Sequence, residues 1–123
     1  MALHPQAGKP AAPEQLINVA QLVSQYYSYK PDAAAPTEAV SFGTSGHRGS
    51  ASNYTFTDTH ISAICQALVE YREAEDITGP LFIGKDTHAL SEPAMITAIE
   101  VLSANGVDVV IQRSDNESLG YTP

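Results

Sequence analysis

A chain of 123 residues is long enough for one modest domain with a single hydrophobic core. Hydrophobic residues make up 43% of it, a globular composition that excludes an intrinsically disordered protein. Acidic residues outnumber basic ones 14 to 6, and the net charge of −8 would repel a polyanion, so nucleic acid is not an expected partner.

The N-terminal segment is expected to be an arm followed by a helix. Residues 1–13 are polar and proline-rich, which is typical of an arm at the surface. Residues 14–29 carry apolar side chains at three- and four-residue steps, including Leu16, Val19 and Tyr26. This spacing predicts an accessory helix that packs one face on the main body.

A linker and a short strand are expected to follow this helix. Residues 30–38 are rich in proline and alanine, so the arm, helix and linker are assigned to 1–38. The main domain is expected over 39–123. A short strand over 39–42 would lead into the stretch 42–50, with the sequence FGTSGHRGS, which we expect to be a loop.

The stretch 42–50 combines three glycines with two hydroxyls, an imidazole and a guanidinium. Glycine lets backbone N–H groups approach a ligand without an intervening Cβ. Hydroxyl and guanidinium groups are donors suited to phosphate or sugar oxygens, so the candidates are Thr44, Ser45, His47 and Arg48. A glycine-rich turn with incidental polar side chains explains the pattern alone equally well. The spacing matches neither nucleotide-binding glycine motifs nor the GxSxG nucleophile motif.

A second helix is expected to begin at Thr57 or Asp58, because either side chain can accept a free N–H at a helix start. The helix would end before the Thr-Gly-Pro segment at 78–80. Its apolar side includes Cys65, whose thiol we expect to be buried. Residues 81–83 are a short apolar run, which predicts a buried strand.

The stretch 84–94, with the sequence GKDTHALSEPA, directly follows that predicted strand. Open α/β sheets bind ligands at such places, outside the carboxyl ends of strands. Lys85 and Asp86 are therefore candidate binding residues. Ser91 is expected to cap a third helix, whose predicted buried side consists of Met95, Ile96, Ile99 and Leu102.

The last predicted element is a strand over 107–111, which follows a helix stop at Asn105-Gly106. Its continuous apolar character favours a parallel sheet, so 81–111 is expected to be a right-handed βαβ crossover. The fold class that follows is α/β, with a mostly parallel sheet in three layers and helices on both faces. Residues 113–123 are polar and are expected to end without a further element.

Cysteine and histidine usage limits the chemistry of the chain. A single cysteine excludes an internal disulfide and a cysteine-based zinc set. The histidines have no metal-ligand spacing, and His4 and His60 are expected at the surface, so no metal site is expected. No apolar run is long enough for a signal peptide or a membrane span, and we expect a cytoplasmic protein with no membrane partner.

Several features of the sequence resemble the first domain of the α-D-phosphohexomutases. They are the stretches FGTSGHRGS and GKDTHALSEPA, the distance between them along the chain, and the helix that ends NGVDVV. The likeness covers about residues 16–123. The LINVAQL segment and the histidine of FGTSGHRG are similar to the bacterial phosphoglucomutase branch. The resemblance implies that this chain is the N-terminal part of a four-domain enzyme. Segments of the TxSHN phosphoserine type and the DGDGDR magnesium type do not occur in the sequence, so we expect the chain alone to be inactive.

For the whole enzyme, the resemblance implies interconversion of glucose 1-phosphate and glucose 6-phosphate through a phosphoserine. Glucose 1,6-bisphosphate would be the intermediate and activator, and Mg²⁺ would be held by ligands outside this chain. Carried over by position, Thr44, Ser45 and Arg48 would face the catalytic cleft. Arg48 would steady phosphate or sugar oxygens, and Arg48, Ser45 and His47 are the catalytic candidates. His47 either polarises a hydroxyl or orients the loop.

The second loop matches the family less closely. Lys85 and Asp86 would bind substrate or, alternatively, brace this loop against the turn at 43–49. His88 stands where the family often has an arginine, which places its direct ligand role in doubt.

Two other hypotheses stay open. In the first, the chain is a stand-alone module that binds sugar phosphates or other small anions. In the second, it is a scaffold domain whose exposed face pairs with a partner protein. An incomplete parallel sheet leaves unpaired edge groups and apolar helix faces. The same exposure predicts self-association into a homo-oligomer. The preferred sugar epimer is expected to depend on a later loop.

Overall fold

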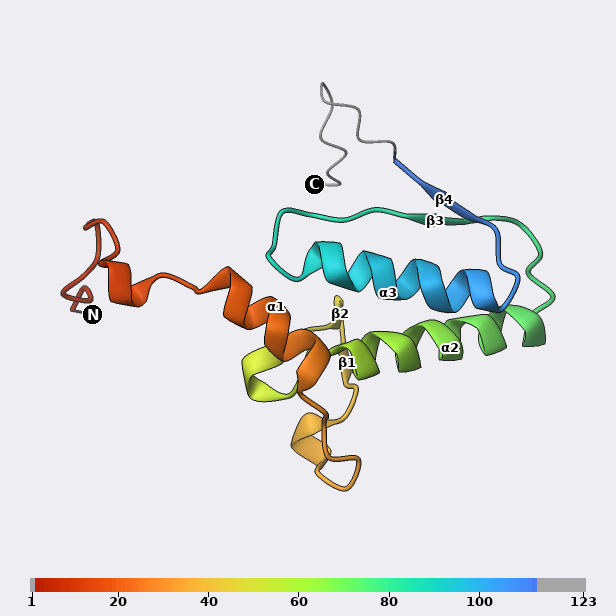
Figure 1. Cartoon of the computed structure of the whole chain (residues 1–123), viewed down its shortest axis with the longest axis horizontal. Helices are drawn as coiled ribbons and strands as arrows, with labels where there is room; N and C mark the ends of the chain where they lie inside the picture. The colour runs from red at the N-terminus through yellow and green to blue at the C-terminus, as the bar shows by residue number, and fades with distance from the viewer. Residues whose placement is uncertain (1, 113–123) are drawn as a thin grey trace.

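The computed structural model describes residues 2–112 (Figure 1). The expected polar end, residues 113–123, therefore lies outside the described residues. Three helices are found in the described part: α1 (Val19–Ser28), α2 (Asp58–Ala74) and α3 (Ser91–Ala104). Its strands are β1 (Phe42–Gly43), β2 (Gly46–His47), β3 (Leu81–Ile83) and β4 (Val109–Ile111), and short 3₁₀ turns cover Pro13–Gln15, Pro36–Glu38 and Ala51–Asn53.

A parallel crossover forms the second half of the described chain. β3 and β4 pair in parallel, with Leu81 opposite Val109 and Ile83 opposite Ile111, and α3 connects them. Figure 1 shows the two strands along one side of α3 and α2 along its other side, where the two helices pack. The α/β class and the βαβ unit are thus confirmed, while the handedness of the crossover stays a prediction.

The end of α3 explains why β4 begins later than expected. Gly106 has φ +72, the left-handed conformation that glycine adopts readily. The Gly106 N–H donates to the Ser103 carbonyl, and the Val107 N–H donates to the Leu102 carbonyl, both at 3.0 Å. These two bonds close the last turn of the helix. Val107 is therefore part of the helix stop, and the strand begins at Val109 and not at residue 107.

The accessory helix also begins later than the sequence pattern predicts. Asn18 accepts the Gln21 N–H on its side-chain oxygen at 3.0 Å, and this cap starts α1 at Val19. A separate 3₁₀ turn covers Pro13–Gln15, and Leu16 directly follows it. Leu16 is consequently 65% exposed and does not pack on the body. The predicted helix over 14–29 was wrong at its start and right at its end.

The packing of α1 is confirmed by its one fully buried side chain. Tyr26 is 0% exposed and forms a core cluster with Ala51 and Leu90. Its hydroxyl lies 2.8 Å from the hydroxyl of Thr97 on α3, which in turn donates to Asp58 at the start of α2 at 2.8 Å. This chain of hydrogen bonds ties all three helices together.

The start of α2 agrees with the predicted cap, but His60 does not lie at the surface. α2 begins at Asp58 after Thr57, and Cys65 is buried as expected. His60 is only 2% exposed. Its Nδ1 accepts the Thr57 N–H at 3.1 Å, and its Nε2 donates to the Glu38 carbonyl at 2.6 Å. The imidazole is buried because both ring nitrogens find backbone partners.

Two details of α3 differ from expectation. Leu90 takes the cap position, while Ser91 is the first helical residue and donates its hydroxyl to Asp86. Ile96 is 44% exposed, and Thr97 is buried in its place because its hydroxyl bonds to Tyr26 and Asp58.

The strand expected over 39–42 is also wrong in part. A 3₁₀ turn covers Pro36–Glu38, and the strand begins only at Phe42.

The arm before α1 extends away from the body (Figure 1). Within residues 2–112, no helix combines the length and the apolar character that a membrane crossing needs.

Candidate active site

The glycine stretch begins as a β-hairpin. β1 and β2 pair antiparallel, with Phe42 opposite His47 and Gly43 opposite Gly46. Gly46 has φ +110, a conformation in which a side chain would be strained. Thr44 and Ser45 form the exposed tip of this hairpin. The two hydroxyls therefore project from the body, and the second half of the stretch forms the wall of a cavity.

His47 fastens this second half to the body. Its Nε2 donates to the Thr55 carbonyl at 2.7 Å, and its Nδ1 lies 3.1 Å from the Ser41 backbone nitrogen and 3.2 Å from the Ser41 carbonyl oxygen. The ring stacks on Phe56, with centroids 6.2 Å apart, and on His60, with centroids 5.5 Å apart. Both ring nitrogens are occupied by backbone atoms, which favours the loop-orienting alternative for His47.

Gly49 is held so closely against Thr55 that only glycine fits. A Cβ at this position would lie 2.4 Å from the Thr55 carbonyl oxygen and 2.6 Å from its hydroxyl oxygen. Real Cβ atoms do not approach other heavy atoms this closely, so the loop or Thr55 would have to move. The contact fixes the backbone immediately after Arg48.

Gly49→Ala is expected to destabilise the protein by about 1–3 kcal/mol, the usual cost of overpacking a close contact. Thermal unfolding measures the effect. Gly79→Ala is the matched control, because no atom lies within 4 Å of a Cβ built there. An unfolding temperature for Gly49→Ala equal to that of Gly79→Ala would contradict the close contact.

The second predicted loop is organised around Asp86. Its carboxylate accepts the Ser91 hydroxyl and the His88 N–H, the latter at 3.0 Å, and it pairs with the His88 ring at 2.6 Å. The hydrogen bond from Ser91, followed by that from the His88 backbone, lowers the pKa of Asp86 to about 2. Asp86 is therefore charged at neutral pH and fixes the turn that leads into α3.

The two loops meet at one cleft of about 560 Å³. Its lining includes Arg48 from the first loop, Asp86 and His88 from the second, and Leu22 of α1. Among residues 2–112, no carboxylate lies within ion-pair distance of the Arg48 guanidinium. A guanidinium that lines a cleft is suited to an anionic, oxygen-rich ligand.

The remaining sequence candidates lie outside this cleft. Thr44 and Ser45 at the hairpin tip do not line it. Lys85 forms an ion pair with Glu92 and lines a neighbouring cavity of about 430 Å³, which also includes Asp86. Lys85 thus braces the start of α3, and the structure brings only Arg48, His47 and Asp86 of the predicted residues to the cleft.

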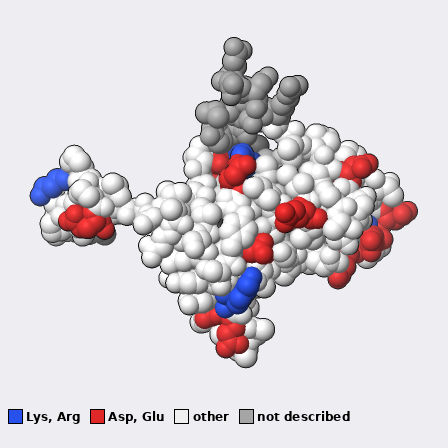
Figure 2. Space-filling model, in the orientation of Figure 1, with Lys and Arg blue, Asp and Glu red and all other residues white. Residues whose placement is uncertain are grey.

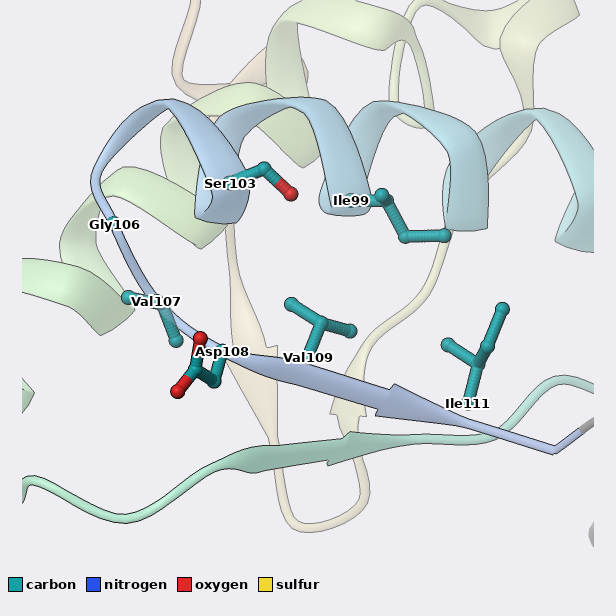
Figure 3. A pocket seen from close by; sticks show the side chains of 7 residues that line it. All are labelled: Ile99, Ser103, Gly106, Val107, Asp108, Val109 and Ile111. Atoms are coloured by element: carbon teal, nitrogen blue, oxygen red, sulfur yellow. The ribbon is translucent and has the colours of Figure 1, made fainter.

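Another cavity lies away from these loops. It has a volume of about 360 Å³ and lies between the end of α3 and β4, where Ile99 and Ser103 face Val109 and Ile111 (Figure 3). Asp108 is its one charged lining residue. A cavity whose one charged lining residue is a carboxylate would repel an anion, so the cleft lined by Arg48 is the stronger candidate.

The cleft does not fit a divalent cation. Asp86 is its only carboxylate, and both of its oxygens already accept hydrogen bonds. In residues 2–112, no three His, Cys, Asp or Glu side chains are grouped as metal ligands would be.

Acidic side chains are spread over the visible face and gather where α2 ends, while basic ones are few (Figure 2).

Sequence reasoning missed two residues that line the cleft and one that contacts the loop beside it. Ile17 and Leu22 come from the N-terminal segment, whose helix was expected only to pack on the main body. Thr55 does not line the cleft but contacts residues on both sides of Arg48. No motif marks these residues, because Ile17 and Leu22 reach the cleft from a segment distant in the sequence and the contacts of Thr55 arise only in the folded loop.

Two comparisons with known proteins identify the family that this chain resembles. Residues 39–114 match the family described as "Phosphoglucomutase/phosphomannomutase, alpha/beta/alpha domain I", and this description agrees with the three-layer expectation. A curated protein from Komagataeibacter xylinus named "Phosphoglucomutase" is 52% identical over 122 residues, which cover 99% of this chain and 21% of the relative. The chain therefore spans about a fifth of the length of that relative.

Proposed function

The chain belongs to the phosphoglucomutase/phosphomannomutase family, and from this premise we propose that it supplies one wall of the active site of a phosphoglucomutase. The reaction is the interconversion of glucose 1-phosphate and glucose 6-phosphate through a phosphoserine and glucose 1,6-bisphosphate. The observation that carries the proposal is the cleft that Arg48 lines together with the loop around Asp86. The 52% identity to a protein named for this activity supports glucose as the sugar.

Arg48 is the residue of this chain that would touch substrate. Its planar guanidinium can donate two parallel hydrogen bonds to phosphate oxygens. Phosphoryl transfer depends mainly on positioning and on charge stabilisation. His47 orients the backbone next to Arg48, and Asp86 holds the opposite loop in place. The hydroxyls of Thr44 and Ser45 would reach substrate only from the hairpin tip.

Mg²⁺ would stabilise the charge on the transferring phosphoryl group in the proposed enzyme. The described residues do not fit such a site, so its ligands would come from other residues of the enzyme. The proposed partner is a small-molecule sugar phosphate, and neither nucleic acid nor a membrane is proposed as a partner. Association into a homo-oligomer is a further proposal, which light scattering would test.

Activity assays test the proposal on the product of the complete reading frame, here called the full-length protein. With glucose 1-phosphate, glucose 1,6-bisphosphate and Mg²⁺, we expect formation of glucose 6-phosphate. A full-length protein without turnover would contradict the proposed function. Mannose 1-phosphate is the matched alternative substrate, and we expect a lower kcat/KM for it.

The isolated 123-residue chain is expected to show no turnover, because its sequence contains neither a TxSHN serine nor a DGDGDR magnesium segment. The same assay without the rest of the reading frame checks this prediction. Turnover above the blank would contradict it. Calorimetry with glucose 1-phosphate tests the alternative of a stand-alone binding module, which requires submillimolar affinity from this chain alone.

A further inference from the structure

We propose that Thr55 is a positioning residue that sets the direction of Arg48, an inference that rests on the proposed function. Thr55 lies outside the cleft and would not touch substrate. Its contacts nevertheless reach the residues on both sides of Arg48. The evidence consists of hydrogen bonds to His47 and Ser50 and of the close approach to Gly49.

The hydrogen bonds to Ser50 use both the hydroxyl and the backbone of Thr55. The Thr55 hydroxyl oxygen accepts the Ser50 N–H at 2.9 Å and donates to the Ser50 carbonyl at 3.2 Å. The Thr55 N–H donates to the same carbonyl at 3.1 Å. Ser50 is thereby held by three bonds to a single residue, two of which require a hydroxyl side chain.

The carbonyl of Thr55 holds the other side of Arg48. It accepts the proton of His47 Nε2 at 2.7 Å, and it lies where a Cβ of Gly49 would have to go. One residue therefore fixes positions 47, 49 and 50, and Arg48, which lies between them, lines the cleft. These contacts set the backbone direction at Arg48. The described residues provide no ion pair that would hold its guanidinium in addition.

Removing the Thr55 hydroxyl should loosen Arg48 without altering the cleft lining. Small misplacements of a catalytic group reduce rates strongly, and each lost hydrogen bond contributes on the order of 1 kcal/mol. Thr55→Val keeps the side-chain shape and removes the two hydroxyl bonds. We expect it to lower kcat/KM of the full-length protein for glucose 1-phosphate by about tenfold.

The conservative variant and a distant control separate positioning from a general loss of hydroxyls. Thr55→Ser retains the hydroxyl and should stay within about twofold of the parent kcat/KM. Thr59→Val removes a hydroxyl from an exposed residue of α2 for which the described residues show no side-chain hydrogen bond. It should also stay within about twofold. A loss in Thr59→Val equal to that in Thr55→Val would overturn the inference.

The decisive readout is the dependence of the Thr55 effect on Arg48. If Thr55 acts through Arg48, Thr55→Val should cost less than about twofold in an Arg48→Ala background, because coupled residues are not additive. A full tenfold loss in that background would show a role that does not pass through Arg48 and would overturn the inference. If Thr55→Val does not fold, Thr55→Ala removes the same hydroxyl, and failure of both to fold also counts against the inference.

The outcomes separate this inference from the function on which it rests. A full-length parent protein without mutase activity contradicts the proposed function. An active parent protein in which Arg48→Ala is strongly impaired and Thr55→Val is within twofold of normal contradicts only the role of Thr55.

Discussion

Arg48→Ala is expected to lower kcat/KM of the full-length protein for glucose 1-phosphate by roughly 10² or more, which corresponds to about 3 kcal/mol of transition-state stabilisation. The reason is that Arg48 lines the same cleft as the loop around Asp86 and has no ion-pair partner among residues 2–112. Steady-state kinetics measure the effect. Because Arg48 is exposed, its removal should leave the unfolding temperature nearly unchanged.

Two control variants identify which property of Arg48 matters. Arg48→Lys keeps the positive charge but loses the planar fork, so its kcat/KM should fall between those of the parent and of Arg48→Ala. Lys30→Ala removes a positive charge from an exposed position after α1 and should have no measurable effect. A loss of less than threefold in Arg48→Ala would remove this residue from the proposed site.

Tyr26→Ala is expected to destabilise the attachment of α1 by about 3–5 kcal/mol, the usual cost of deleting a buried aromatic side chain. Tyr26 is fully buried against Ala51 and Leu90 and bonds to Thr97. Hydrogen exchange over residues 19–28 should become at least roughly 10²-fold faster, since each 1.4 kcal/mol corresponds to a factor of ten. Tyr71→Ala, in an exposed part of α2, is the matched control and should leave this exchange unchanged.

The hydroxyl of Tyr26 gives the protein a separate dependence on alkaline pH. Burial raises the pKa of Tyr26 from its ordinary value of 10.0 to about 12. Between these values the unfolded chain releases the phenolic proton before the folded chain does, so the free energy of unfolding falls as the pH rises. Tyr26→Phe should abolish this part of the alkaline dependence. An identical dependence in the parent and in Tyr26→Phe would contradict the burial of the hydroxyl.

Local sequence signals predicted the elements whose boundaries are set by neighbouring residues. α2 begins after Thr57 and β3 covers 81–83 as expected, because caps, breakers and short apolar runs act over a few residues. The start of α1 was missed because the Asn18 cap competes with an apolar pattern that begins earlier. The hairpin at the glycine stretch had a signal, since two residues separate Gly43 from Gly46, a spacing typical of tight hairpin turns.

The candidate site was only partly predictable, because its geometry depends on contacts between distant segments. The sequence identified Arg48 and Asp86, but the exposed position of Thr44 and Ser45 follows from the hairpin register. The burial of His60 depends on the Glu38 carbonyl, 22 residues earlier. The role of Thr55 depends on its contacts with His47, Gly49 and Ser50, which no motif connects to it. Such placements require coordinates, because nothing in the local pattern distinguishes them from ordinary loop residues.

An experimental structure of the full-length protein with glucose 1-phosphate bound would test the proposed cleft most directly. We expect the Arg48 guanidinium within hydrogen-bonding distance of a phosphate or sugar oxygen, with the loop around Asp86 on the opposite side. Substrate bound elsewhere, with Arg48 directed away from it, would contradict the assignment of this cleft.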